Sequence, residues 1–347
     1  MVDVLIKSRS SSYNMLCQTS RNKQLDIAKG IGIILVVLGH QIDFFDVAFP
    51  MVYRYIYLFH VPLFFFLSGL FFNESESFRN CFEKKFRRLF VPFVLVNIFF
   101  FFVEMIRAWK LGMAYDGELG WKDLWLACIG GCPVPSMLAG PSWFLLVLFR
   151  IILIYKFFML LTGGRKWLMA VICVVLVFIG VEYAPRTYML GQTMVALSFF
   201  CVGHICGVDL VMKKFFGTVD AVIGTLAALP LLYLISRHQH TNIAMNVYGN
   251  VVLMYLGASL GIFAVLWISK LMEKMPILAN PISFIGQYTL SILIWHIFIM
   301  KVLFTVFEYV GWEGNPLIPI IAFIAGVFIP CVMSMLYCKM KNRIWSR

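Results

Sequence analysis

The first long apolar run of the sequence carries an ionisable residue at each end. Lys29 and His40 are eleven positions apart in the stretch KGIGIILVVLGHQID, and only apolar residues and glycine lie between them. In an α-helix, eleven residues at about 100° each make three turns plus about 20°, so both side chains lie on one face, roughly 16 Å apart along the axis. An imidazole in such apolar surroundings could be a general base or a transient nucleophile, and we predict that His40 carries the chemistry.

Histidines also lie inside two other apolar runs, at a similar predicted depth. His60 and His296 are candidate catalytic residues, because an ionisable side chain within a membrane span is costly. The alternative is that each caps a backbone carbonyl between helices. A preorganised donor should stabilise a developing oxyanion, and Ser68, His60 and Trp143 are the candidates for that donor.

Further charged residues complete the predicted set of intramembrane polar groups. Asp26 precedes Lys29 by less than one turn and is expected to orient it. Glu104 and Arg150 reach mid-membrane depth, and with Asp26 and Trp143 they are candidate contacts for an acceptor substrate. Glu104 and Arg150 could instead form a structural ion pair, or Glu104 could lie near the outer headgroups.

Four other ionisable residues are expected to be structural or solvated. His204 and Lys156 lie near the inner ends of their apolar runs, where the histidine is expected to be structural and the lysine to extend towards water. His238 and His240 fall in a predicted outer loop and are expected to be solvated.

A short basic segment precedes the third apolar run. The stretch RNCFEKKFRRLFVPF holds five basic residues from Arg79 to Arg88, against one acidic residue, Glu83. The preference of cytoplasmic loops for positive charge accounts for such a cluster by composition alone. Its density just before a span also favours a phosphate site at the mouth of a helix bundle. The predicted phosphate-binding residues are Lys29, Lys84, Lys85, Arg87 and Arg88.

The composition is typical of a polytopic membrane protein. Of the 347 residues, 61% are hydrophobic and 13% are charged, whereas soluble domains are about half apolar and a quarter charged. The formal net charge of +12 is spread between apolar runs. It therefore indicates cytoplasmic loops and an anionic ligand or headgroup, and it is weak support for nucleic-acid binding.

Ten apolar runs are long enough to be membrane spans, which predicts an all-α fold with about ten transmembrane helices. The runs are too long, and alternate too little, to be strands. They are Gly30–Phe45, Tyr53–Phe72, Leu89–Ile106, Ser142–Leu161, Trp167–Tyr183, Tyr188–Val208, Val219–Ile235, Asn250–Ile268, Tyr288–Val306 and Leu317–Tyr337.

The distribution of lysine and arginine predicts that both termini are cytoplasmic. In that orientation the inner segments hold 20 basic residues and the outer segments hold six. Residues 1–26 are then a cytoplasmic tail, 27–338 the transmembrane domain, and 339–347 a second cytoplasmic tail. The longest outer segment, Arg107–Pro141, has room for a small structure of its own before an irregular glycine- and proline-rich end.

Cysteine and histidine spacing indicates no metal site. The nine cysteines include no C-x-x-C pair, and there is no histidine-rich tract. Cys128 and Cys132 lie four apart in a predicted outer loop, where they either form a disulfide or stay free.

These stretches together resemble acyltransferase family 3, whose members include membrane O-acetyltransferases of bacterial surface sugars. The segment RNKQLDIAKGIGIILVVLGH is similar to the first-span signature of that family, and FHVPLFFFLSGLFF is similar to its second. KKFRRLFVP resembles its basic loop ahead of a proline, and PSWFLLVLF and SILIWHIF resemble later spans. Lys29 and Lys85 stand where members often have arginine; a lysine cannot make the bidentate phosphate contact of an arginine.

The resemblance implies an integral protein of the bacterial inner membrane that transfers an acyl group, most often acetyl. The donor would be cytoplasmic acetyl-CoA or another acyl-CoA, with no permanently bound cofactor. The acceptor would be a hydroxyl of a cell-surface carbohydrate or a lipid-linked glycan. The phosphates of CoA would lie at the basic loop and Lys29, and the pantetheine arm would reach towards His40. The acceptor, the acyl chain and the oligomeric state are left open.

Two other classes of protein fit parts of the pattern. Histidine, glutamate and arginine at mid-membrane depth also suit a proton-coupled transporter or a flippase of a glycan or lipid-linked precursor. Such proteins usually have repeated halves with helices broken at matching positions, and the sequence has no internal repeat. A non-enzymatic membrane scaffold would leave Lys29, His40 and the basic segment unexplained.

Overall fold

The computed structural model describes residues 22–44, 49–110, 121–130, 140–184, 187–213, 217–312 and 314–345. Within these ranges the chain is helical apart from short connections, which confirms the predicted all-α class. The helices are α2 (Lys23–Phe44), α3 (Pro50–Tyr57), α4 (His60–Leu70), α5 (Phe78–Lys85), α6 (Val91–Lys110), α7 (Trp121–Ile129), α8 (Trp143–Leu161), α9 (Lys166–Glu182), α10 (Leu190–Lys213), α11 (Thr218–His238), α12 (Val251–Glu273), α13 (Pro276–Gln287), α14 (Thr289–Tyr309) and α15 (Leu317–Trp345).

Each predicted apolar run falls on one of these helices or on a consecutive pair. In the described part of the chain, eight helical segments are long and apolar enough to cross a membrane. The two other predicted spans are α9, which has 17 residues, and α2, which includes Asp26 and Lys29. The polytopic membrane class is confirmed, and the side on which each terminus lies stays a prediction.

The second predicted span is broken just before His60. α3 ends at Tyr57 and α4 begins at His60, so Leu58 and Phe59 separate them. Pro62 has no N–H to donate to the carbonyl of Leu58, four residues earlier, so an unbroken helix is costly at this point. The break makes His60 the first residue of α4, where it is buried.

The predicted basic loop is helical. α5 runs into a π-helical turn, Phe86–Phe90, and then into α6. Pro92 cannot donate to the carbonyl of Arg88, so the regular α pattern cannot continue. The N–H of Val91 bonds instead to the carbonyl of Phe86, five residues earlier. Because the segment is helical, its basic residues are divided between different faces.

No apolar run predicts α13, which packs against α2 at close range. A Cβ added at Gly286 of α13 would clash with the carbonyl oxygen of Asp26, and one added at Gly30 of α2 would clash with that of Ile282. Small residues of this kind let two helix backbones approach closely. The contact fixes α13 against the part of α2 that carries Asp26 and Lys29.

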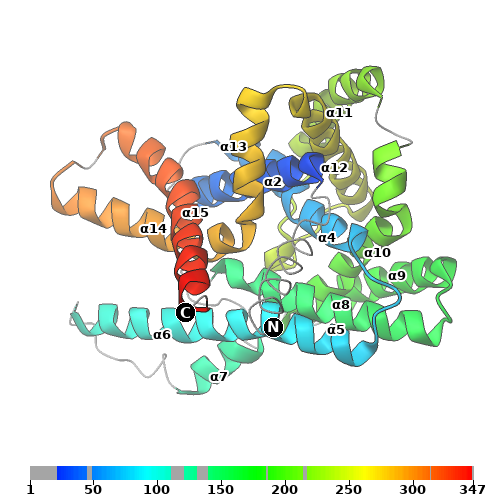
Figure 1. Ribbon diagram of the computed structural model, residues 1–347, viewed down its shortest axis with the longest axis horizontal. Helices are drawn as coiled ribbons and strands as arrows, with labels where there is room; N and C mark the ends of the chain where they lie inside the picture. Colours follow the sequence, from blue (N-terminus) through cyan, green and yellow to red (C-terminus); the bar gives the residue numbers. More distant parts are fainter. Residues whose placement is uncertain are drawn as a thin grey trace, which may run out of the picture.

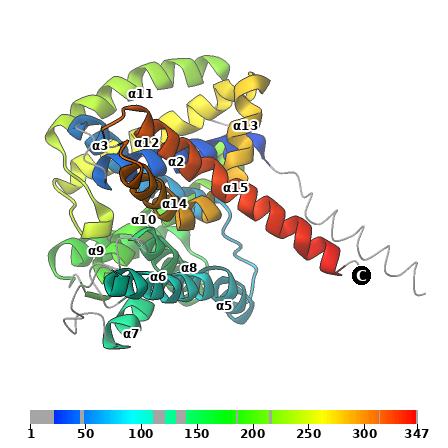
Figure 2. The ribbon, with the colours of Figure 1, turned by 90° about the vertical axis from the view of Figure 1, so that its left-hand side faces the viewer.

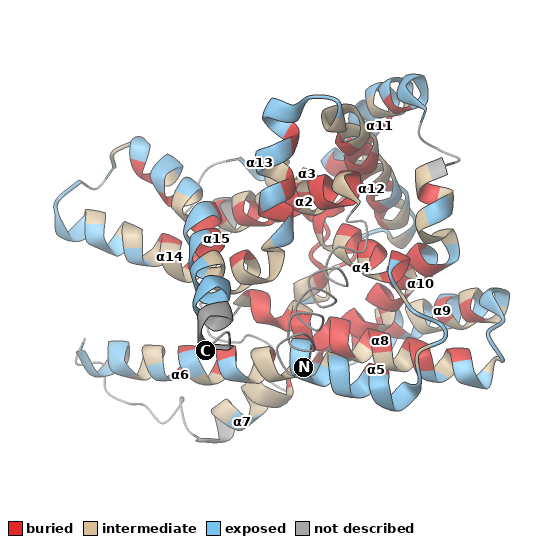
Figure 3. Ribbon diagram, in the orientation of Figure 1, coloured by how far each residue is buried: buried red, intermediate tan, exposed pale blue. Residues whose placement is uncertain are grey.

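The most buried helices lie at the centre of the molecule. Figure 1 shows α5 and α6 as an almost continuous rod along one edge, with α8 near it, and α2 further inside beside α12 and α13. Buried residues concentrate on α2, α4, α8 and α10, whereas α9 and α11 are largely exposed (Figure 3). The exposed side chains of α9 and α11 are mostly apolar, as expected of helices that face lipid. Figure 2 shows α15 extending beyond the other helices towards the C-terminus.

The close contact between α2 and α13 predicts that Gly286→Ala destabilises the protein. The added methyl group must displace backbone, and overpacking of this kind costs about 1–3 kcal/mol of the free energy of unfolding. The measurement is the apparent Tm of the purified protein in detergent. Gly140→Ala is the matched control, because nothing lies within 4 Å of a Cβ added there. Equal Tm values for Gly286→Ala and wild type would contradict the packing described here.

Candidate active site

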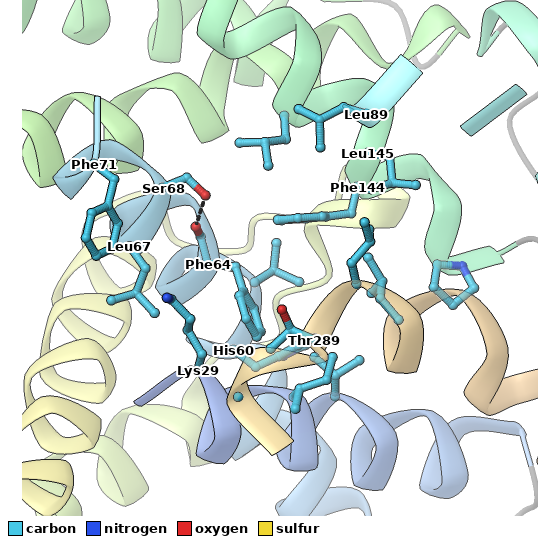
Figure 4. Close-up of a pocket in the computed structure, with 18 of the residues that line it drawn as sticks. Lys29, His60, Phe64, Leu67, Ser68, Phe71, Leu89, Phe144, Leu145 and Thr289 are labelled. Carbon is cyan, nitrogen blue, oxygen red and sulfur yellow. Dashed lines mark hydrogen bonds between the residues drawn. The ribbon is translucent and has the colours of Figure 1, made fainter. Parts of the chain in front are cut away.

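One cavity brings together residues from both ends of the first apolar run. It has a volume of about 730 Å³ and lies between α2, α4, α8, α14 and the π-helical turn. Small-molecule sites commonly measure about 300–1,000 Å³. Lys29 and His40 both line the cavity, which confirms that they share one face of α2. Figure 4 shows Lys29, His60, Phe64 and Thr289 on one side of this space, with Phe144 and Leu89 on the other.

The end of the cavity near the start of α2, here called the mouth, is cationic. Lys29, Lys85 and Arg88 line it together with Asp26. Nζ of Lys29 lies 3.1 Å from Oδ1 of Asp26 and 5.1 Å from the centre of the Phe71 ring. The contact predicted between Asp26 and Lys29 is therefore present. One carboxylate among three cations leaves a positive potential that favours an anionic ligand.

The other two basic residues of the predicted phosphate site point elsewhere. Lys84 forms an ion pair with Glu76 and is exposed, and Arg87 is also exposed. Neither Lys84 nor Arg87 lines the cavity, whereas Lys85 and Arg88, three residues apart on one helix face, both do. The sequence could not show which of these basic residues face the cavity. It predicts a loop, which has no fixed faces, whereas the structure has a helical turn, which does.

Two histidines form the opposite, deep end of the cavity, and a third lies behind them. His40 and His60 line the deep end. His296 is fully buried and is not part of the lining, but its ring centre lies 5.2 Å from that of His40. The three predicted histidines are thus close together, and His296 contacts His40 from outside the cavity lining.

His60 and His296 each use Nδ1 to bind a backbone carbonyl. Nδ1 of His60 lies 2.8 Å from the carbonyl oxygen of Ile56, across the break between α3 and α4. Nδ1 of His296 lies 2.7 Å from that of Ile292, within α14. A carbonyl only accepts, so Nδ1 donates in both cases and Nε2 of the neutral ring is left to accept. Nε2 of His296 is buried, with no hydrogen-bond partner among the described residues.

The predicted oxyanion donors differ in their surroundings. Ser68 lines the cavity, but its hydroxyl donates to the carbonyl of Phe64 at 2.7 Å (Figure 4). Trp143 is buried at the start of α8 and lines the cavity, just after the helical turn Gly140–Ser142. In this geometry the hydrogen of Ser68 and the Nδ1–H of His60 are already used, which leaves Trp143 as the best placed donor.

Glu104 and Arg150 do not form the predicted alternative ion pair. Glu104 pairs with Arg107 in its own helix at 3.4 Å. Arg150 donates to the carbonyls of Tyr188 and Ile129. Neither Glu104 nor Arg150 lines the cavity. The sequence gives the depth of Glu104 and Arg150 in the membrane but not the rotation of each helix about its axis. Their partners could therefore not be predicted from depth alone.

The connection between α4 and α5 is held by a polar cluster. The Glu74 carboxylate accepts from Lys166 at 3.0 Å and lies 2.8 Å from Nε2 of His204. The other ring nitrogen of His204 lies 2.7 Å from the hydroxyl of Tyr155. Lys156, predicted to extend towards water, is instead 2% exposed and donates to the carbonyl of Glu74 at 2.6 Å. This cluster anchors the segment that leads into α5 and into residues 84–88, here called the basic turn.

Three polar residues that line the cavity were not predicted from the sequence. Asn22 lines the cavity and caps the first turn of α2, its Oδ1 accepting from the N–H of Leu25 at 3.1 Å. Gln287 and Thr289 line it between α13 and α14. The stretch GQYT is a polar break before an apolar run, which by itself predicts only the end of a span.

Two other predictions concern cysteines and metals. Cys132 lies outside the described residues, so the predicted alternatives for Cys128 and Cys132 stay open. In the described ranges, no group of three or more His, Cys, Asp or Glu side chains could hold a metal ion.

A comparison with protein families agrees with the geometry of the site. The model of the acyltransferase domain of acyltransferase family 3 matches residues 22–335, nearly the whole chain. The chain therefore belongs to acyltransferase family 3, and it is a multi-pass membrane protein of the acyltransferase class. Comparisons with curated proteins and with solved structures gave no match.

The cluster around Glu74 predicts a dependence of stability on pH. Its hydrogen bond with Lys166 lowers the pKa of the Glu74 carboxyl below the ordinary value of 4.5. A lowered carboxyl pKa contributes stability that is complete above about pH 4.5 and is lost as the pH falls through the lower pKa of the folded state. The Glu74 side chain is 47% exposed, so screening by water limits the effect to about 1 kcal/mol or less.

We therefore expect Glu74→Gln to have a lower apparent Tm than wild type at neutral pH and a smaller loss of Tm on acidification. Glu83→Gln is the control, because it removes the same charge from an exposed pair with Arg79. If Glu74→Gln and Glu83→Gln give the same pH profile, the cluster does not stabilise the α4–α5 connection.

Proposed function

We propose that the protein transfers an acyl group, acetyl in the first instance, from acyl-CoA to a hydroxyl of a carbohydrate. The observation that carries this proposal is a single cavity with cations at its mouth and two histidines at its deep end. CoA has the matching chemistry, with phosphates at one end and a thioester at the other end of an extended arm. Membership of acyltransferase family 3 supports the class of reaction.

The mouth would bind the phosphates of the donor. The Arg88 guanidinium can present two N–H groups to one phosphate, whereas Lys29 and Lys85 act as compact charges. Asp26 keeps Lys29 at the wall by their 3.1 Å contact. The walls between the mouth and the histidines include Ile33, Phe64 and Leu148, so the arm of the donor would run through apolar surroundings.

The deep end would carry out the transfer. His40 takes the proton of the acceptor hydroxyl while its oxygen attacks the thioester carbonyl carbon. The tetrahedral intermediate places negative charge on the former carbonyl oxygen, which the Trp143 N–H would stabilise. The C–S bond then breaks, the acyl group stays on the acceptor oxygen, and the CoA thiolate recovers the proton. A transient acyl group on His40 is the alternative route to the same products.

This reaction requires the mouth to face the compartment that holds CoA. We therefore propose that the start of α2 and the basic turn face the cytoplasm, as the distribution of basic residues predicts. The membrane would be the bacterial inner membrane, and the acceptor a cell-surface or lipid-linked sugar presented from the outside.

The break before His60 gives the transporter hypothesis one observation in its favour. Discontinuous helices often bind substrates in transporters, and α3 and α4 form such a pair next to a buried histidine. A transporter does not cleave its substrate, so release of CoA thiol from acetyl-CoA by the purified protein would exclude this alternative.

Lys85 and Arg88 line the cavity and Lys84 and Arg87 do not, which predicts that only the first two bind the donor. Lys85→Ala and Arg88→Ala should each raise KM for acetyl-CoA about tenfold, because each loses a charge-assisted contact with phosphate. Lys84→Ala and Arg87→Ala remove the same charge from neighbouring residues outside the cavity, and their KM should stay within about twofold of wild type. Equal increases in all four variants would mean that only the net charge of the segment matters, and would refute the assignment.

The position of His40 predicts that it is essential for transfer. His40→Ala should lower kcat at least about a hundredfold, the usual contribution of a general base, and the Kd for acetyl-CoA should change little because the mouth is intact. His238→Ala, which alters an exposed histidine, is the control for loss of an imidazole. A correctly folded His40→Ala protein that retained substantial activity would rule out the proposed role.

A further inference from the structure

A row of aromatic rings leads away from the deep end of the cavity. The ring of Tyr57 in α3 lies 4.7 Å from that of His60 and 6.4 Å from that of His40, measured between centres. Tyr53, one turn earlier, stacks on Tyr57 with 3.8 Å between ring centres and 24° between ring planes. Tyr57 is buried, and Tyr53 is partly exposed. Neither tyrosine lines the cavity, so the row lies beyond the histidines as seen from the mouth.

The outer end of this row meets the connection between α11 and α12, residues 239–250. The ring of His240 lies nearly parallel to that of Tyr53, with 22° between planes and 6.1 Å between centres. The side-chain amide of Asn242 donates to the Tyr53 hydroxyl at 3.0 Å. His240 is exposed, as predicted for an outer loop, so exposure rises along the row from Tyr57 to Tyr53 to His240.

This connection is held in place far more firmly than a simple link between two helices requires. Nε2 of the buried Gln239 donates to Thr241 at 3.0 Å and to the carbonyl of Tyr248 at 2.6 Å. The N–H of Asn242 donates to the carbonyl of Val247 at 2.7 Å, and the N–H of Val247 donates back at 3.0 Å. Connections usually vary and move, so one that is fixed in this way presents its polar groups in a set geometry.

We propose that Tyr53 and His240, backed by the buried Tyr57 and Asn242, form the binding surface for the acceptor, and that the acceptor is a neutral sugar ring. The inference rests on the proposed function, because it assigns the second substrate of that reaction. Tyr57 covers one face of the Tyr53 ring, so the other face and the exposed His240 ring would stack on the C–H face of the sugar. An aromatic face carries partial negative charge and C–H groups carry partial positive charge. The amide of Asn242 would exchange its bond to Tyr53 for one to a sugar hydroxyl.

The chemistry of this surface favours a sugar over a charged acceptor. The contacts of Tyr53 include a tyrosine, an imidazole and a neutral amide, and amides and hydroxyls both donate and accept hydrogen bonds. The position of Tyr57 against His60 and near His40 would direct a hydroxyl of the bound ring towards the base. The donor would thus approach the histidines from the mouth and the acceptor from the side of the tyrosines.

The test uses cells that lack their own copy of the gene and express one variant each. Tyr53→Leu removes the aromatic face, and Tyr53→Phe keeps the face but loses the hydroxyl that binds Asn242. Tyr309→Leu is the control, because it removes a fully exposed tyrosine at the end of α14, away from this row. Mass spectrometry of the surface glycans measures acyl transfer, and titration of each purified variant with acetyl-CoA measures binding of the donor.

We expect Tyr53→Leu to lower glycan acylation about tenfold with an unchanged Kd for acetyl-CoA, and Tyr53→Phe and Tyr309→Leu to stay within about threefold of wild type. Normal acylation by Tyr53→Leu would overturn the acceptor surface. A loss of acylation together with weaker acetyl-CoA binding would also overturn it, because Tyr53 would then act through the fold or the donor site.

The same experiment separates failure of this inference from failure of the proposed function. If wild type leaves the surface glycans without any added acyl group and does not bind acetyl-CoA, the proposed function itself is wrong. If wild type acylates a glycan and binds acetyl-CoA, only the assignment of the acceptor surface depends on the behaviour of Tyr53→Leu.

Discussion

The separation between the cationic mouth and the histidine end of the cavity is set by one α-helix. Lys29 and His40 belong to the same uninterrupted helix, so their spacing of roughly 16 Å follows from the rise per residue and cannot change without breaking that helix. Packing of Gly30 and Gly286 backbone to backbone holds α2 against α13. The helices α4, α13 and α14 pack directly against α2 and bring His60, Gln287 and Thr289 to the cavity.

Those other helices reach the site through local departures from regular geometry. The break between α3 and α4 places His60 at a helix start, and the π-helical turn before α6 brings Lys85 and Arg88 to the mouth together. A proline lies at each departure, Pro62 at the break and Pro92 after the π-helical turn. Proline has no N–H to donate to the carbonyl four residues earlier, so the regular helix is interrupted there. The irregular backbone thus lies where the side chains line a cavity, which is where membrane helices tolerate it.

The sequence predicted what depends on spacing within one helix and missed what depends on contacts between helices. The all-α class follows from the length of the apolar runs, and the shared face of Lys29 and His40 follows from their eleven-residue spacing. The partners of Glu104 and Arg150 could not be predicted, since they depend on how each helix is rotated. α13 was missed because it is short and interrupted by polar residues, and Tyr53 because an aromatic residue in an apolar run carries no distinguishing signal.

The central claim is that a ligand bound by the cationic mouth extends through the cavity to position 40. Its most direct test is protection of a single cysteine, His40→Cys, introduced into an otherwise cysteine-free protein. Desulfo-CoA carries the phosphates and the arm of CoA without its thiol, so it can compete with N-ethylmaleimide without reacting with it. The account predicts that saturating desulfo-CoA slows labelling of the cysteine at position 40 at least about tenfold and leaves a cysteine placed at Lys84 unaffected. Equal labelling at position 40 with and without desulfo-CoA would contradict the account.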